Sequence, residues 1–160
     1  MSARVGVGYD VHRYATDESR VLVLGGVRFP GENGLAGHSD ADVVAHSVAD
    51  AMLGAAGLGD LGAHFSDQDE RWQSADSMDL LARVAQLVQN EGFRLTNADC
   101  TVVCDRPRLV GSREEMMRKL SAAAGGPVHV KATRPEGLGA LGRREGIACM
   151  AVALLELVAS

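Results

Sequence analysis

The chain has 160 residues, of which 46% are hydrophobic and 23% are charged, as is ordinary for a globular protein. This length fits one domain, residues 1–160, with enough chain to bury a core. The formal net charge is −5 and aromatic residues make up 4%, so neither a basic surface nor base-stacking side chains support a nucleic-acid partner.

Sequence features that mark membrane or exported proteins are missing. No apolar run is long enough to span a bilayer, and the N-terminus has no basic start followed by an apolar signal core. The three cysteines, Cys100, Cys104 and Cys149, form no C-x-x-C pair, as is typical of reduced thiols. Cys100 and Cys104 share a strand face and either bind a metal or, as we favour, fill the core. We expect a cytoplasmic protein without a membrane partner; a plant protein would be plastidic, but this chain shows no transit peptide.

The first half of the chain combines short strands with one long helix. The pattern of apolar residues and glycines predicts a strand at 4–8, a hairpin of strands at 21–24 and 27–29, a loop at 31–37 and a helix at 40–56. Gly25-Gly26 is the hairpin signal. Ser39 followed by Asp42 has the spacing of a capping box, which places Ser39 as the cap of the helix.

The second half alternates helices and strands. The pattern predicts a polar loop at 60–75, a helix at 76–91, a strand at 95–104, an exit loop at 104–110, a helix at 112–124 and a strand at 128–132. The apolar segment 147–158 fits either a helix or a buried strand. The order of elements indicates an α/β protein with one layer of sheet and one layer of helices.

A candidate metal site begins in the stretch GYDVHRY. Asp10 and His12 follow the strand expected at 4–8 and are two residues apart, so in an extended chain their side chains point to the same face and reach one point just beyond the strand. In the predicted helix, Asp42, His46 and Asp50 are four residues apart and form a stripe opposite the apolar face. A catalytic zinc site has three protein ligands and one open position, which Asp10, His12 and His46 would supply. The alternative is a surface histidine beside a helix-capping aspartate.

Several polar loops are candidates for binding a substrate. In this acidic chain, two loops that follow strands hold Arg106, Arg108, Lys131, Arg134, Arg143 and Arg144. That clustering favours a phosphate partner. The alternative is that these are charged loops that only face solvent. A helix start near Ser39 offers free N–H groups to an anion, or is capped by Ser39 alone. The acidic loop 59–69 could bind hydroxyl groups or a divalent cation, or could be only a polar loop.

Read together, these stretches resemble one family. The signatures GYDVH, LAGHSDADVVAH, DAMLGAAGLGDLGAHFSDQD, VKAT and LGRREG occur in order along nearly the whole chain. They are similar to those of the 2-C-methyl-D-erythritol 2,4-cyclodiphosphate synthase family of the non-mevalonate isoprenoid pathway. The combination of D-x-H with HSDxDVxxH is specific to that family.

The resemblance implies a fold and an assembly. The fold is an α/β (α+β) two-layer sandwich, in which a mainly four-stranded mixed sheet carries helices on one face and a small hairpin is added. The last segment, 147–158, is then a strand. The family assembles as a homotrimer whose active sites lie between neighbouring subunits.

The resemblance also implies the site residues. Asp10, His12 and His46 match the ligands of a divalent metal, usually Zn²⁺, and Glu136 matches a ligand of a second divalent ion, Mg²⁺ or Mn²⁺. His38, Thr133 and Arg134 stand at positions that act on the transition state. The positions that match substrate contacts are Asp10, Val11, His12, His38, Ser39, Asp60, Leu61, Gly62, Phe65, Ser66, Asp67, Gln68, Asp69, Cys104, Asp105, Arg106, Pro107, Arg108, Leu109, Val110, Thr133, Arg134, Pro135, Glu136, Ala140 and Arg143.

The implied reaction is the conversion of 4-diphosphocytidyl-2-C-methyl-D-erythritol 2-phosphate, a small cytidine diphosphate substrate, to the cyclodiphosphate with release of CMP. A lyase of this kind needs no enzyme nucleophile, because the attacking phosphate belongs to the substrate. Metal-bridged phosphates and positioning supply the catalysis. The alternatives are a non-catalytic homologue that binds metal and cytidine nucleotide, or a metal-dependent phosphohydrolase.

This chain departs from the family pattern in two loops. Thr133-Arg134-Pro135-Glu136 stands where Thr-Thr-Thr-Glu is usual, so an arginine replaces the second threonine and either strengthens phosphate binding or misplaces the phosphate. Ala140 replaces the phenylalanine that lines an apolar cavity on the trimer axis. Arg144 replaces a usual glycine, and Ser66 stands where proline is common. None of these changes removes a metal ligand.

Overall fold

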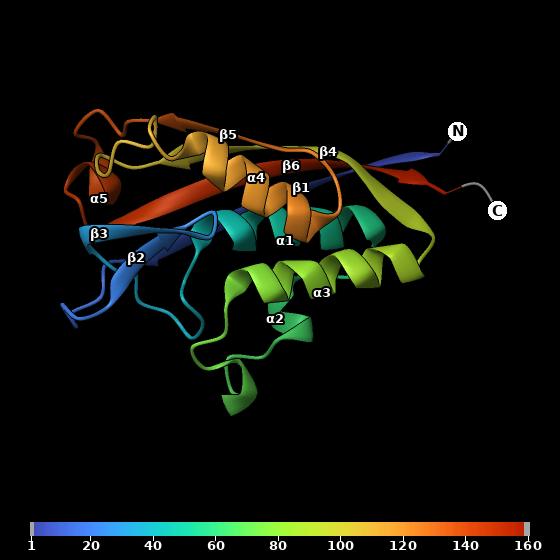
Figure 1. The fold of residues 1–160 in the computed structure, drawn as a ribbon, viewed down its shortest axis with the longest axis horizontal. Helices are drawn as coiled ribbons and strands as arrows, with labels where there is room; N and C mark the ends of the chain where they lie inside the picture. The colour runs from blue at the N-terminus through green and yellow to red at the C-terminus, as the bar shows by residue number, and fades with distance from the viewer. Residues whose placement is uncertain (1, 159–160) are drawn as a thin grey trace.

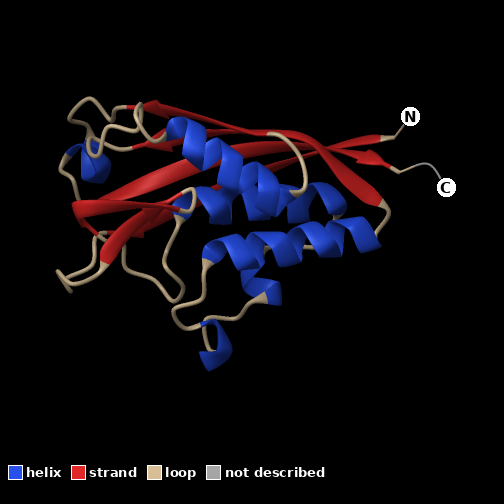
Figure 2. Ribbon diagram, in the orientation of Figure 1, coloured by secondary structure: helices blue, strands red, loops and turns tan. Residues whose placement is uncertain are grey.

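The computed structural model describes residues 2–158, which form a sheet layer and a helix layer (Figures 1 and 2). The four-stranded sheet has the order β1-β6-β4-β5, with β1 at Ala3–Arg13, β6 at Gly146–Leu157, β4 at Phe93–Val103 and β5 at Val128–Thr133. β6 pairs antiparallel with β1 and β4, whereas β4 and β5 are parallel. The expected mixed sheet is therefore confirmed, and the last apolar segment is a strand.

Helices cover one face of this sheet (Figure 2). The long helices are α1 at Val43–Ala56, α3 at Ser77–Asn90 and α4 at Arg113–Ala124, and the separate hairpin joins β2 at Val21–Leu24 to β3 at Val27–Asn33. Short helices α2 at Leu61–His64, η1 at Glu70–Trp72 and α5 at Gly139–Gly142 lie in stretches that the sequence predicts as loops. Helices this short span too few residues for a hydrophobic period to reveal them.

The start of α1 differs from the expectation. Its N-cap is Asp42, whose Oδ1 accepts from the N–H groups of Val44 and Ala45 at 3.1 and 3.2 Å. The same carboxylate accepts from Gly25 N at 2.9 Å and Gly26 N at 2.7 Å, and so joins the β2–β3 turn to the helix. The prediction that Ser39 caps α1 is wrong, because Asp42 lies next to the helix and satisfies two of its free N–H groups.

Asp42 is also fully buried rather than part of an exposed polar stripe. Burial is the main cause that raises the pKa of Asp42 to about 6, and the charge of Asp40 adds to it, while backbone N–H groups act in the opposite direction. α1 is buried on nearly every side because it packs against β1, β6 and α3. His46 therefore faces the protein interior and β1, not open solvent.

Two glycines in β1 let α1 lie directly on the strand. A Cβ atom added at Gly6 would stand 2.0 Å from the carbonyl oxygen of Ala51, and one added at Gly8 would stand 1.9 Å from that of Ser47. Alternate residues of a strand share one face, so Asp10 and His12 point to the same side as these glycines. The close approach thus places His46 of α1 against Asp10 and His12.

The opposite face of the sheet is apolar and uncovered. Its exposed side chains are Val5, Val7, Tyr9 and Val11 of β1 with Met150 and Val152 of β6. Exposed fractions of 65% for Val5 and 62% for Val7 are unusual on adjacent positions of a strand face, and contiguous apolar surface of this kind marks an interaction site. Among residues 2–158, no helix combines the length and the apolar character needed to cross a membrane.

Candidate active site

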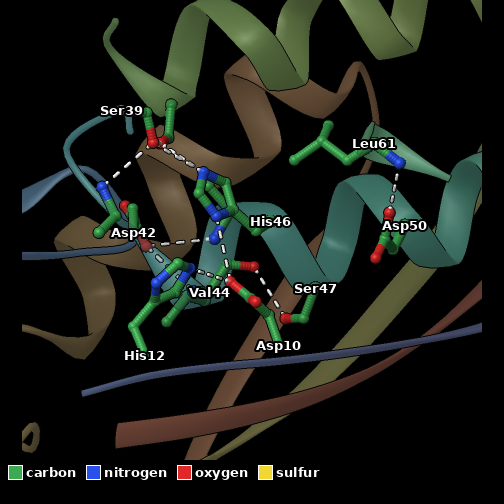
Figure 3. A network of polar contacts seen from close by, with 12 residues as sticks. Asp10, His12, Ser39, Asp42, Val44, His46, Ser47, Asp50 and Leu61 are labelled. Carbon is green, nitrogen blue, oxygen red and sulfur yellow. Dashed lines mark hydrogen bonds and ion pairs between the residues drawn. The ribbon is translucent and has the colours of Figure 1, made fainter. Parts of the chain in front are cut away.

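Three side chains of the kinds that bind metals meet where β1 and α1 touch (Figure 3). One donor atom each from Asp10, His12 and His46 lies within 4.8 Å of the other two. The Oδ2 atom of Asp10 is 3.1 Å from Nε2 of His12 and 3.1 Å from Nδ1 of His46. The grouping that same-face spacing predicts is therefore present.

Hydrogen bonds on the far side of each ring decide which nitrogen faces the centre. Nδ1 of His12 is 2.7 Å from the carbonyl oxygen of Ala36, so this nitrogen carries the proton and Nε2 is left as the ligand. His46 is held the other way round: its Nε2 lies 3.1 Å from Ser39 Oγ and 2.9 Å from Ser77 Oγ, and Nδ1 faces Asp10. Both rings are thus oriented by the surrounding protein.

The electrostatics of the group suit a cation. Burial acts to raise the pKa of Asp10, but the contacts with His12 and His46 prevail and hold that pKa well below its usual range. The Asp10 carboxylate in turn raises the pKa of His12, against the effect of burial. One carboxylate oxygen and two imidazole nitrogens form a donor set that fits zinc and similar ions, and three protein ligands leave a position for a substrate atom.

A cavity of about 330 Å³ opens beside this group. Its lining combines His12 and His46 with six residues that the sequence predicts as site residues or their neighbours, namely Gly37, His38, Ser39, Phe65, Ser66 and Asp67, and with Leu61 at the start of α2. Leu61 is held there by its N–H group, which donates to Oδ1 of Asp50 on α1 at 2.7 Å. Segments far apart in the sequence therefore converge on the candidate metal centre.

A second cavity, of about 800 Å³, lies at the ends of β4 and β5. Because these strands are parallel, the loops that follow them leave the same edge of the sheet. The lining includes the whole predicted stretch Cys104–Val110 together with Thr133 and Arg134. A third cavity, of about 550 Å³, is lined by Val11, His12 and Ala140 among others.

The remaining predicted site residues lie outside these cavities. Asp60 caps α2 by accepting from Ala63 N at 2.9 Å, and Asp69 binds Arg71. Arg143 Nε donates to Glu145 Oε1 at 2.6 Å. Gly62, Gln68, Pro135 and Glu136 line none of the cavities described above, and Glu136 does not belong to the Asp10, His12 and His46 group.

The structure adds residues that sequence reasoning missed. Trp72 and Leu80 line the cavity beside the metal group, and the ring of Trp72 packs edge-on against Phe65 with centroids 5.0 Å apart. Ser77 orients His46, and its hydroxyl in turn donates to the Asp40 carboxylate. A serine at a helix start looks like any other first-turn residue, so no sequence signal marks Ser77.

Comparisons with known proteins agree with this geometry. The model of the YgbB family matches residues 3–156. A protein of Salinibacter ruber named 2-C-methyl-D-erythritol 2,4-cyclodiphosphate synthase is 52% identical, over 96% of this chain and 98% of its own length. The bifunctional IspDF of Campylobacter jejuni is 39% identical with a TM-score of 0.92, over 98% of this chain and 42% of that one.

A solved structure of a nucleotide complex is also similar to this chain. The Plasmodium falciparum IspF, described as a CDP complex, is 29% identical with a TM-score of 0.85, over 99% of this chain and 98% of that one. Each of these comparisons covers nearly the whole of this chain. The chain belongs to the YgbB family.

Proposed function

We propose that this chain is a 2-C-methyl-D-erythritol 2,4-cyclodiphosphate synthase of the non-mevalonate isoprenoid pathway. It converts 4-diphosphocytidyl-2-C-methyl-D-erythritol 2-phosphate to the 2,4-cyclodiphosphate and CMP. The observation that carries the proposal is the group of Asp10, His12 and His46 beside the cavity that holds His38 and Ser39. Relatives of this name match nearly the full length of the chain at about 50% identity, and a related structure is described as binding CDP.

The reaction asks the protein to position charge rather than to supply a nucleophile. An oxygen of the substrate's 2-phosphate attacks the β-phosphorus of the diphosphate, a new P–O bond forms, and the bond between that phosphorus and the CMP oxygen breaks. CMP leaves as an anion that needs little protonation. The work left to the site is to fold a flexible anionic chain into a ring, screen its charge and exclude water.

Residues of this chain fit those tasks. Asp10, His12 and His46 would hold a divalent ion, for which we favour Zn²⁺, and such an ion draws negative charge from phosphate oxygens when bound. His38 and Ser39 hold the phosphates at the open side of that group. The packed rings of Phe65 and Trp72 keep water from that side of the cavity.

The second cavity takes the cytidine part of the substrate. The loop 104–110 surrounds the base and sugar, while Thr133 and Arg134 contact the phosphates and the charge that develops on them. Glu136 takes part in holding a second divalent ion, Mg²⁺ or Mn²⁺, once the diphosphate is bound. The methylerythritol part lies along residues 60–69, with Ala140 and Arg143 as further contacts.

The direct test is an assay with the diphosphocytidyl substrate in the presence of Zn²⁺ and Mg²⁺. We expect CMP and the cyclic diphosphate in equal amounts, observed together by ³¹P NMR. CMP release with an open-chain product would instead identify a phosphohydrolase. Binding of CMP without turnover would identify a non-catalytic homologue that binds metal and cytidine nucleotide.

A homotrimer with active sites between neighbouring subunits is part of the proposal. The uncovered apolar face of β1 and β6 supports it, because burying such a surface against another subunit removes apolar area from water.

The chain is one domain over residues 1–160. Cys100, Cys104 and Cys149 are free and buried, as suits a reducing compartment such as the cytoplasm.

A charge on the uncovered sheet face should dissociate the trimer. Val7 is 62% exposed in the single chain, and a Val7→Lys substitution would bury an unpaired ammonium at a subunit interface, which is costly. Light scattering after size exclusion should shift from the mass of three chains to that of one. Val158→Lys, at a 50% exposed position beyond the end of β6, serves as the control and should remain trimeric. A trimeric Val7→Lys variant would argue against this interface.

A further inference from the structure

The cavity at the ends of β4 and β5 has an unusual charge balance for an acidic protein. Among the described residues that line it, five are arginines and one is acidic: Arg106, Arg108, Arg113, Arg134 and Arg144 against Asp105. Several guanidinium groups around one concave space create a local positive potential. Such a space favours a ligand that carries phosphate.

Two of the arginines converge on the acidic residue from different loops. Nη2 of Arg134 donates to Oδ1 of Asp105 at 2.9 Å, and Nε of Arg144 donates to Oδ2 at 2.5 Å. The Asp105 side chain is 16% exposed, whereas those of Arg134 and Arg144 are 65% and 62% exposed. The more buried carboxylate therefore shares its two oxygens between two guanidinium groups that remain open to solvent.

Arg144 occupies a backbone conformation that does not suit its residue type. Its φ angle is +59°, in the left-handed region that favours glycine. A bulky residue that stays in such a conformation points to a role for its side chain. Arg144 also lines the third cavity with His12 and Tyr14, so it borders both the arginine-rich cavity and the cavity that reaches a metal ligand.

We propose that Arg134 and Arg144 form a two-arginine clamp for a phosphate group of the substrate, with Asp105 as the internal counter-ion that the phosphate displaces. A phosphate offers paired acceptor oxygens as a carboxylate does, so both guanidinium groups can exchange one partner for the other within the same cavity. A ligand must compete with Asp105, and a diphosphate carries more charge for this than a monophosphate. Asp105 is thus a specificity-determining residue that favours the diphosphate over CMP.

This inference rests on the proposed function in one respect, which is the identity of the nucleotide whose phosphate the two arginines bind. The test measures CDP binding to the zinc-loaded full chain by calorimetry with Mg²⁺ present. In Arg144→Gly the glycine suits the φ angle, so the fold should be at least as stable as wild type while one guanidinium is lost. CDP should then bind about five-fold more weakly or worse, the loss expected for one solvent-exposed charge contact.

The second variant should change affinity in the opposite direction. Asp105→Asn removes the competing carboxylate, and CDP should bind about three-fold more tightly, with a steeper dependence on salt. The preference for CDP over CMP should become smaller. The control is Glu156→Gln, which also removes one carboxylate and one ion pair, with Arg94, but near the opposite end of β6. Its CDP affinity should equal that of wild type.

Other results would overturn the inference. Unchanged CDP affinity in Arg144→Gly excludes the clamp, and unchanged or weaker affinity in Asp105→Asn excludes Asp105 as a competitor. If wild type does not bind CDP, the nucleotide assignment of the proposed function fails, and the same variants are then measured with inorganic pyrophosphate. If wild type binds pyrophosphate and Arg144→Gly binds it more weakly, the clamp is supported. If wild type does not bind pyrophosphate, the clamp is excluded.

Discussion

Replacing His46 with alanine should abolish stoichiometric zinc binding and reduce cyclase activity at least about 100-fold at a fixed zinc concentration. Nδ1 of His46 is one of three donor atoms that lie within 4.8 Å of one another. Loss of this atom leaves two protein ligands, too few for a zinc site of either the structural or the catalytic kind. Metal content is measured by mass spectrometry after gel filtration, and activity by CMP release.

The matched control for this result is His64→Ala. His64 contacts the carbonyl oxygen of Leu58 at 2.8 Å through Nε2 and does not belong to the metal group. This variant should keep one zinc per subunit. Both variants should unfold in a single cooperative transition. Stoichiometric zinc in His46→Ala would show that the ligand set is wrong.

Replacing Gly8 with alanine should destabilise the protein by about 3 kcal/mol or more. The added Cβ would stand 1.9 Å from the carbonyl oxygen of Ser47 and 2.8 Å from the amide nitrogen of Ala51. Both are backbone atoms of a buried helix, so neither can move aside as a flexible side chain would. Relief requires α1 to lift from β1, which would also move His46 away from Asp10. Urea unfolding measures the loss of stability, and zinc affinity should fall with it.

Gly54→Ala provides the control for the glycine substitution. Gly54 is exposed on the same helix, and a Cβ atom added there meets nothing within 4 Å. Alanine should stabilise the helix there by about 0.5–1 kcal/mol, since it restricts the unfolded chain and favours the helix. Equal effects of the two substitutions would mean that the contact between β1 and α1 is not tight.

The Asp10 and His12 half of the metal group could be predicted from the sequence because its geometry is local, whereas the position of His46 against it depends on the close packing of α1 on β1. Asp10 and His12 share a strand face by the two-residue period alone, and His46 lies in a strongly predicted helix. The ring orientations could not be predicted, because the carbonyl of Ala36 and the hydroxyl of Ser77 reach the two histidines from separate segments. Sequence spacing carries no information on such contacts.

The helix cap and the contacts within the arginine cluster could likewise not be predicted from the sequence. By sequence alone, either Ser39 or Asp42 could cap α1. Which of them does so depends on the turn at Gly25 and Gly26, because the Asp42 carboxylate also binds that turn. The pairing of Asp105 with Arg134 and Arg144 depends on loops that meet because β5 is parallel to β4 and β6, which follows Arg144, is antiparallel to β4. Local pattern predicted both loops, but not which charges in them would meet.

The pairing of β1 with β6 has a consequence for the order of events during synthesis. Ala3 lies opposite Glu156 and Arg13 opposite Gly146, and β1 is an edge strand whose sheet partner is β6 alone. β1 and β6 must therefore meet before β1 is held in the sheet, and closing the long loop between them costs conformational entropy. A nascent chain whose β6 has not yet left the ribosome has Asp10, His12 and His46 but not the strand that secures β1. We expect stable zinc capture to follow the emergence of β6.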